Sequence, residues 1–188
     1  MPHGVDIDLF GADTQRPDDL PEERPVAGFV GTLADWIDID LIKGVAEALP
    51  GWLFVLIGSV RTDLHGLDRM ANVVLLGPRP HATLPAYLQH MDVAMLPFKD
   101  NAQIRACNPL KLREYLASGV PVATTDFPAL DGYRDLVHIS ARTPDAFADA
   151  ICKSGKEGRT RSDVRLARVA GESWTERAHR AEAWMERL

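Results

Sequence analysis

Two runs of sequence decide the fold, Val26-Ala27-Gly28-Phe29-Val30-Gly31 and Leu53-Phe54-Val55-Leu56-Ile57-Gly58. Each is an apolar run of strand length that a glycine closes, and such runs indicate strands buried on both faces. Between them, residues 38–49 space their apolar side chains as a helix does and stop at Pro50-Gly51. A buried strand, a helix and a second buried strand are typical of a βαβ unit in a parallel sheet.

The same alternation continues toward the C-terminus. Further strands are expected at residues 73–76, 93–96, 120–124 and 136–139, and further helices at 83–90, 109–118, 144–151 and 163–188. Thr83 is expected to cap one helix, and residues 153–162, rich in Gly, Ser and Lys, predict a loop. The pattern predicts an α/β fold, a Rossmann-like parallel sheet of about six strands flanked by helices. This domain is expected to span residues 25–188, after an irregular lead-in over residues 1–24 that is rich in Pro and Asp.

The composition excludes several classes of protein. The 188 residues carry a formal net charge of -6, so the overall basic field that nucleic-acid binding requires is missing. No run of about eighteen apolar residues is present, and the N-terminal residues lack the pattern of a secretory signal. The two cysteines stand apart and favour a reducing, cytosolic compartment, and the six histidines are scattered, so no metal site is expected. Dinucleotide, phosphate-loop and GxSxG motifs are absent, which argues against dehydrogenases, P-loop NTPases and serine hydrolases.

The strongest local signal is a helix marked at both ends, Asn108-Pro109-Leu110-Lys111-Leu112-Arg113-Glu114-Tyr115-Leu116-Ala117-Ser118-Gly119. Asn108 suits the N-cap, Pro109 the first helical position and Gly119 the position after the C-cap. Because this helix follows one parallel strand and precedes the next, its N-terminus should face the edge of the sheet where ligands bind.

The charges of this helix point to an anionic ligand. Lys111 lies in the first turn, with Arg105 just upstream, where the helix dipole disfavours a cation unless an external anion binds there. Glu114, three residues further on, could accept hydrogen bonds from sugar hydroxyls, and a phosphate grip beside a hydroxyl grip describes a nucleotide site. An alternative stays open at this point, in which Lys111 and Glu114 form only a solvated pair worth about 0.2–0.5 kcal/mol.

At these residues the chain resembles the C-terminal, nucleotide-sugar-binding half of GT-B glycosyltransferases, and most of all the family 4 (group 1) enzymes. Four stretches carry the resemblance, in the order of the family: Pro2-His3-Gly4-Val5-Asp6 with Phe10, Gly28 to Trp36, Pro109 to Val122, and Ser173-Trp174-Thr175 with Arg177. The resemblance implies one half of a GT-B fold, with residues 1–24 as an interdomain linker and an N-terminal acceptor domain that lies outside this chain.

The resemblance also implies roles for individual residues. Lys111 and Glu114 would be the catalytic residues, with Glu114 on the ribose hydroxyls and Lys111 on the diphosphate. The other residues implied to bind the donor are Gly31, Thr32 and Leu33 on the phosphate side, Gly77 to Arg79 near the base, Arg105, and the backbone of Asn108, Pro109 and Leu110.

The sequence departs from the family at two places. Many relatives carry an earlier glutamate where this chain has Ala106, so donor-sugar recognition cannot be carried over to that position. Many also carry an Arg and a Lys after the first strand, where this chain has Thr32 to Asp35. Neutralisation of the phosphates would then depend on Lys111, aided by Arg105 or Arg61.

The activity implied is transfer of a hexosyl group from a nucleoside diphosphate sugar to an acceptor hydroxyl, with retention of configuration, no required cofactor and no metal. Bacterial surface polysaccharide or glycolipid synthesis would be the setting, in the cytoplasm or at the inner face of the membrane, with peripheral membrane association through the acceptor domain. This chain alone is expected to be inactive. The alternatives are a non-catalytic α/β module that binds or regulates partners, and a sugar-nucleotide epimerase or phosphorylase of the same architecture.

Overall fold

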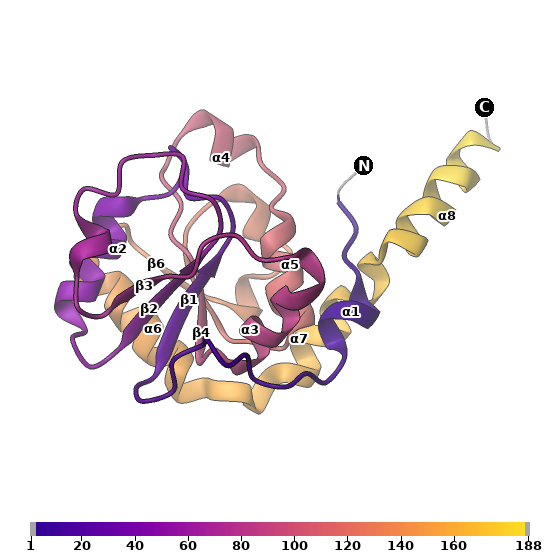
Figure 1. Ribbon diagram of the computed structural model, residues 1–188. Coiled ribbons are helices and arrows are strands. Elements are labelled where there is room, and N and C mark those ends of the chain that lie inside the picture. The colour runs from indigo at the N-terminus through magenta and orange to yellow at the C-terminus, as the bar shows by residue number, and fades with distance from the viewer. Residues whose placement is uncertain (1–2, 187–188) are drawn as a thin grey trace.

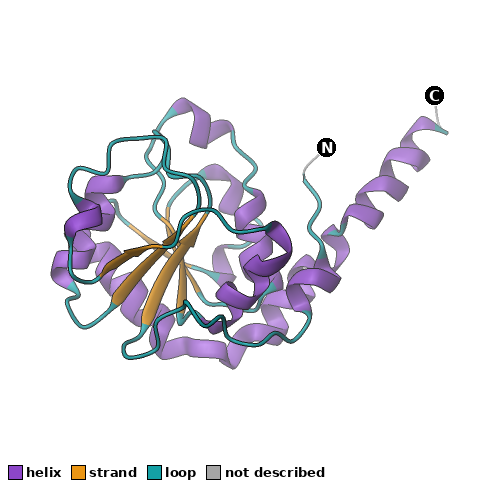
Figure 2. Cartoon of the chain, viewed as in Figure 1, coloured by secondary structure: helices purple, strands orange, loops and turns teal. Residues whose placement is uncertain are grey.

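The apolar runs of the sequence form a parallel sheet in the computed structural model, which describes residues 3–186 (Figures 1 and 2). Within that range the sheet has six strands in the order β3-β2-β1-β4-β5-β6. The strands are β1 Val26–Val30, β2 Leu53–Ile57, β3 Val73–Leu75, β4 Val93–Leu96, β5 Val122–Thr125 and β6 His138–Ser140. The predicted α/β class and six-stranded parallel sheet are therefore confirmed. Pro2 and Leu188, which belong to the N-terminal motif and the C-terminal helix of the sequence analysis, lie outside the described residues.

The order of the strands reverses between β1 and β4. β1 pairs with β2 over its whole length but with β4 only at Ala27↔Val93 and Gly28↔Ala94, so β1 and β4 separate toward their carboxyl ends. Open α/β sheets bind their ligands at such a switch point, at the carboxyl edge of the sheet. The topology therefore directs attention to the loops that follow β1 and β4.

Helices cover both faces of the sheet (Figure 1). One face carries α2 Ile39–Ala48 and α6 Pro144–Glu157, and the other carries α3 Leu84–His90, α5 Leu110–Ala117 and α7 Ser162–Val169. A short helix, α4 Ala102–Ala106, lies in the loop after β4, and α8 Trp174–Met185 projects away from the body of the domain (Figure 1). None of the helices within residues 3–186 is long and apolar enough to cross a bilayer.

Arg159 joins the C-terminal ends of α3 and α5. Its Nη1 donates to the carbonyl of Ser118 at 2.9 Å, and its Nη2 donates to the carbonyls of Leu88 at 3.0 Å and Met91 at 3.1 Å. The last carbonyls of a helix lack partners within the helix, and a cation stabilises the negative end of the dipole. One guanidinium thus caps two helices at the amino edge of the sheet.

The described part of the lead-in, residues 3–24, is irregular as predicted except for one short helix. Ile7–Gly11 forms a helix, α1, whose N-terminus is capped by the Asp6 carboxylate, which accepts from the Leu9 N–H at 2.9 Å. Phe10 on α1 is fully buried against the domain, and Leu20 is buried as well. The segment is ordered because it contributes side chains to the core.

Two further boundaries differ from the prediction. α6 continues to Glu157, through the residues expected to form a loop, since Gly155 leaves the space that the Trp52 ring occupies, only 2.6 Å from where a Cβ would lie. The region expected as a continuous helix from residue 163 contains α7 and α8, separated at residues 170–172. Thr83 is the N-cap residue of α3, as predicted, but its side chain makes no capping hydrogen bond, and its hydroxyl donates to the Pro80 carbonyl instead.

Candidate functional site

A cavity of about 240 Å³ lies at the carboxyl edge of the sheet, where β1 and β2 end and α3 and α5 begin. Its lining residues are Val30, Gly31, Thr32, Ile57, Gly58, Ser59, Pro78, Arg79, Leu84 and Lys111. Four of the residues predicted to bind a donor are therefore brought together, namely Gly31, Thr32, Arg79 and Lys111.

The two glycines at the floor of the cavity allow the backbones after β1 and β2 to approach each other. The Gly31 N–H donates to the Ile57 carbonyl at 2.8 Å. A Cβ on Gly58 would lie 1.9 Å from the Gly31 carbonyl oxygen, and Gly58 has a φ of 149°, which side chains disfavour. Gly58 is thus required for the shape of the cavity.

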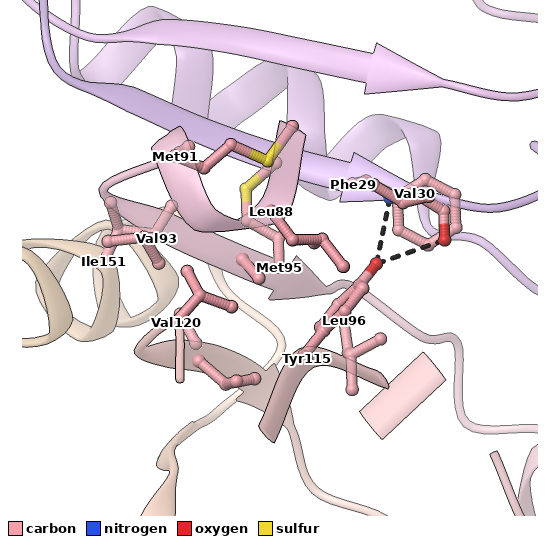
Figure 3. Close-up of a cluster of buried hydrophobic side chains, with 14 of the residues drawn as sticks. Phe29, Val30, Leu88, Met91, Val93, Met95, Leu96, Tyr115, Val120 and Ile151 are labelled. Atoms are coloured by element: carbon pink, nitrogen blue, oxygen red, sulfur yellow. Dashed lines mark hydrogen bonds between the residues drawn. The ribbon is translucent and has the colours of Figure 1, made fainter. Parts of the chain in front are cut away.

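Tyr115 fixes the position of α5 against β1. Its hydroxyl accepts from the Val30 N–H at 2.9 Å and donates to the Val30 carbonyl at 3.2 Å (Figure 3). Val30 lies two residues beyond Gly28, which forms the last β1–β4 pair. The Tyr115 hydroxyl therefore bonds backbone groups of Val30 that β4 does not reach. Burial raises the pKa of the Tyr115 phenol well above its usual value, so the hydroxyl stays protonated.

The N-terminus of α5 has a different cap from the one that the sequence predicts. Pro109 is the N-cap residue, one position later than expected, and it has no side-chain acceptor for the N–H groups of the first turn. The Asn108 side chain does not cap the helix because its carbonyl oxygen accepts from Arg113 Nη1 at 2.6 Å. Uncapped N–H groups and the positive end of the dipole favour an anion, and Lys111 adds a charge at the second helical position. Gly119 follows the C-cap with a φ of 67°, as predicted.

Glu114 lies behind Lys111 and is almost completely buried. Its Oε2 accepts from Lys111 Nζ at 2.6 Å, and its Oε1 is 3.0 Å from His81 Nε2. The Glu114 side chain is only 2% exposed, so the interpretation of Lys111 and Glu114 as a solvated surface pair is wrong. A buried carboxylate needs compensating donors, and here two of them cover it.

Arg79 is held at the cavity by the lead-in. Arg79 Nη2 donates to Asp19 Oδ2 at 2.6 Å, and the Tyr87 hydroxyl donates to Asp19 Oδ1 at 2.8 Å. The hydrogen bond from Arg79 is the main reason that the pKa of the Asp19 carboxyl lies below its usual value. The position of Arg79 therefore depends on a residue that precedes the predicted domain.

The remaining predicted residues do not line this cavity. Leu33 is fully buried and uses its N–H on the Ser59 carbonyl. Arg105 points elsewhere, because it makes two hydrogen bonds to Asp100, at 2.7 and 3.0 Å, beside a separate cavity of about 460 Å³. That cavity is lined by Asp100, Ile104, Arg105, Asp126, Phe127, Pro128, Asp131, Arg134 and Arg142, and its three arginines are matched by three aspartates.

Four predicted residues contribute backbone to the surroundings of the cavity. The Gly77 carbonyl accepts from the Gly58 N–H at 3.0 Å, which holds the loop after β3 beside the cavity. Asn108, Pro109 and Leu110 form the entry to α5 but are not among its lining residues.

His81 is the site residue that the sequence analysis does not select. It follows a predicted strand at the ligand edge of the sheet, but the six histidines are scattered along the sequence and none of them belongs to a recognisable motif. Its partner, Glu114, is 33 residues away in the sequence, so no local spacing links the two. Among the residues that the structure describes, no three His, Cys, Asp or Glu side chains gather as a metal-binding group.

A family model and a curated relative both match this chain. A family model described as glycosyl transferases group 1 matches residues 24–155. The Bacillus subtilis (strain 168) protein TuaH, whose name describes it as a teichuronic acid biosynthesis glycosyltransferase, is 34% identical over 134 residues. This alignment covers 68% of the present chain and 34% of TuaH.

Solved structures share the fold. The structure of Anabaena Alr3699/HepE in complex with UDP and glucose has a TM-score of 0.75 at 18% identity and covers 97% of this chain. A glycosyltransferase from Rickettsia africae ESF-5 has a TM-score of 0.78 at 12% identity and covers 98%. The present chain spans 55% of each of these structures, about half of their length. At these identities the similarity establishes the architecture alone.

Proposed function

Because the chain belongs to the group 1 glycosyl transferases, we propose that it binds the nucleoside diphosphate part of a sugar donor at the cavity between β1 and α5. The observation that carries this proposal is the position of Lys111. Its ammonium lies at the uncapped N-terminus of α5, at the rim of the cavity and in contact with the buried Glu114 carboxylate.

The diphosphate is expected to lie against α5. The N–H groups of the first turn, the helix dipole and the Lys111 ammonium all favour negative charge at one point. Arg79 adds a second cation, since it lines the same cavity as Lys111. Negative charge that develops on the departing diphosphate during sugar transfer would be stabilised by the same groups.

The ribose is expected to bind at Glu114. An ionised carboxylate only accepts hydrogen bonds, so it suits the vicinal hydroxyls of a ribose and rejects a phosphate. The Glu114 side chain is only 2% exposed and is covered by Lys111 and His81, so a hydroxyl can reach the carboxylate only when one of these two side chains moves. A diphosphate supplies the reason, because it attracts the Lys111 ammonium away from Glu114.

The activity of the complete enzyme is part of the proposal. The acceptor hydroxyl, and the groups that activate it, would come from a second domain linked through the lead-in, and transfer would retain the anomeric configuration. The name of TuaH supports surface polysaccharide as the product class, and the complex of HepE, a protein of the same fold, with UDP makes UDP the first nucleotide to test. Peripheral membrane contact would then depend on the acceptor domain.

Titration calorimetry tests the donor site. We expect one of UDP, GDP and ADP to bind, and Lys111→Ala to weaken that binding by about ten- to a hundredfold, since hydrogen bonds to charged groups contribute about 1.5–3 kcal/mol. Glu114→Gln should weaken the binding of the same nucleotide and leave the affinity for pyrophosphate unchanged. Lys43→Ala is the matched control, because Lys43 lies on α2 and its ammonium bonds to the His65 carbonyl.

Two results would refute the donor site. If none of the nucleotides binds, although urea unfolding shows that the protein is folded, the proposal is wrong. Equal losses of affinity for Lys111→Ala and Lys43→Ala would also refute it, because the effect would then come from net charge alone. A separate assay with a UDP-sugar and a soluble acceptor should detect no transfer by this chain alone.

A further inference from the structure

His81 contacts the buried carboxylate from the side opposite Lys111. His81 Nε2 and Glu114 Oε1 are 3.0 Å apart, and because an ionised carboxylate cannot donate, Nε2 must carry the proton. The imidazole is 56% exposed at the surface of the site, whereas the carboxylate beneath it is 2% exposed. His81 therefore connects the solvent side of the site to an acidic group that solvent does not reach.

The orientation of the imidazole is fixed by the lead-in. The Phe10 ring on α1 meets the His81 ring edge to face, with centroids 5.3 Å apart and planes at 66°. Phe10 is fully buried, so it provides a rigid support. His81 thus lies between a fixed aromatic ring and the Glu114 carboxylate, an arrangement that leaves its Nε2 aimed at Oε1.

The two donors of Glu114 differ in what a nucleotide would do to them. Lys111 lines the cavity and would turn to the diphosphate, which would leave Oε2 without a partner. His81 does not line the cavity and would keep its bond to Oε1. If His81 were absent as well, the buried carboxylate would lose both of its present donors, which is strongly unfavourable.

We propose that His81 is a positioning residue for the ribose, in an inference that rests on the proposed nucleotide site. It holds Glu114 Oε1 and keeps the carboxylate oriented, while Oε2 passes from the Lys111 ammonium to a ribose hydroxyl. His81 itself touches neither the diphosphate nor the sugar. His81 should therefore increase the affinity only for ligands whose ribose hydroxyls bond to Glu114.

The test compares nucleotides with and without ribose hydroxyls. UDP, GDP and ADP and their 2′,3′-dideoxy forms are titrated calorimetrically against the wild-type chain, His81→Ala and His81→Gln. In the wild type the dideoxy form of the bound nucleotide should bind about tenfold more weakly, the size of one hydrogen bond to a charged group. His81→Ala should reduce the ratio of the two affinities, ribose form over dideoxy form, to about one or two, and most of the lost affinity should be for the ribose form. His81→Gln, whose amide N–H can replace Nε2–H, should restore most of the ratio.

His90→Ala is the matched control. His90 lies at the C-terminal end of α3, and its Nδ1 contacts the Ala86 carbonyl, away from the cavity. This variant should keep the wild-type ratio, and urea unfolding of every variant separates loss of binding from loss of folding.

The outcomes separate this inference from the proposal beneath it. If the wild type binds no nucleoside diphosphate, both are wrong. If the wild type prefers ribose nucleotides and Glu114→Gln abolishes that preference while His81→Ala keeps it, the nucleotide site stands and the role of His81 is refuted.

Discussion

Tyr115→Phe tests how much the fold depends on the one hydroxyl that bonds the β1 backbone where β1 separates from β4. The change removes the oxygen that bonds both backbone groups of Val30, at 2.9 and 3.2 Å, and leaves the rest of a fully buried side chain in place. A buried donor or acceptor left without a partner costs about 1–3 kcal/mol. Because the change leaves one buried donor and one buried acceptor without a partner, we expect the free energy of unfolding to fall by about 3 kcal/mol.

This loss is measured by urea unfolding at pH 6 and at pH 9. The second value lies about one unit below the ordinary tyrosine pKa. The loss should be equal at both values, since burial raises the pKa of the Tyr115 phenol and keeps it neutral throughout. Tyr87→Phe is the matched control, because Asp19 and Arg79 still bond to each other at 2.6 Å when the Tyr87 hydroxyl is gone. We expect it to cost about 1 kcal/mol. The reasoning is wrong if Tyr115→Phe costs no more than Tyr87→Phe.

Two further predictions concern stability. Gly58→Ala should lower the free energy of unfolding by about 1–3 kcal/mol and weaken nucleotide binding, because the new Cβ would collide with the Gly31 carbonyl; Gly51→Ala, with nothing within 4 Å, should do neither. Burial raises the pKa of Glu172, but hydrogen bonds from Tyr133 and Arg113 outweigh it and hold the pKa below 4.5. As the pH falls, the unfolded chain therefore takes up a proton at Glu172 at a higher pH than the folded protein does. Glu172 stabilises the fold above its unfolded pKa, and this contribution is lost as the pH falls through the folded pKa. Urea midpoints between about pH 5 and pH 3 should decline less steeply in Glu172→Gln, and equal slopes would contradict this.

The strands could be predicted from the sequence because a buried parallel strand has a local signature. In Leu53–Ile57 every residue is apolar and every residue is buried, and the following Gly58 marks the carboxyl end. The position of Lys111 in the first turn followed from the same logic, since a helix between two parallel strands starts at the ligand edge.

The parts that sequence reasoning missed depend on contacts between distant residues. Asn108 is a good N-cap residue, but Arg113, bound to Glu172 at 2.6 Å, takes its side chain, so Pro109 becomes the cap. Gly155 interrupts a helical pattern in the sequence, yet α6 continues through it because Trp52 packs there. His81, in the turn before α3, reaches Glu114 on α5 only after the chain folds, because the two residues are 33 positions apart in the sequence.

Arg159 gives the cavity a determinant on the far edge of the sheet. α3 and α5 both begin at the cavity, at Leu84 and near Lys111, and both end at this one guanidinium. The two helices are therefore linked at the ends that lie away from the cavity. A substitution at Arg159 would leave the last carbonyls of both helices without this donor, and it would remove no group that lines the cavity.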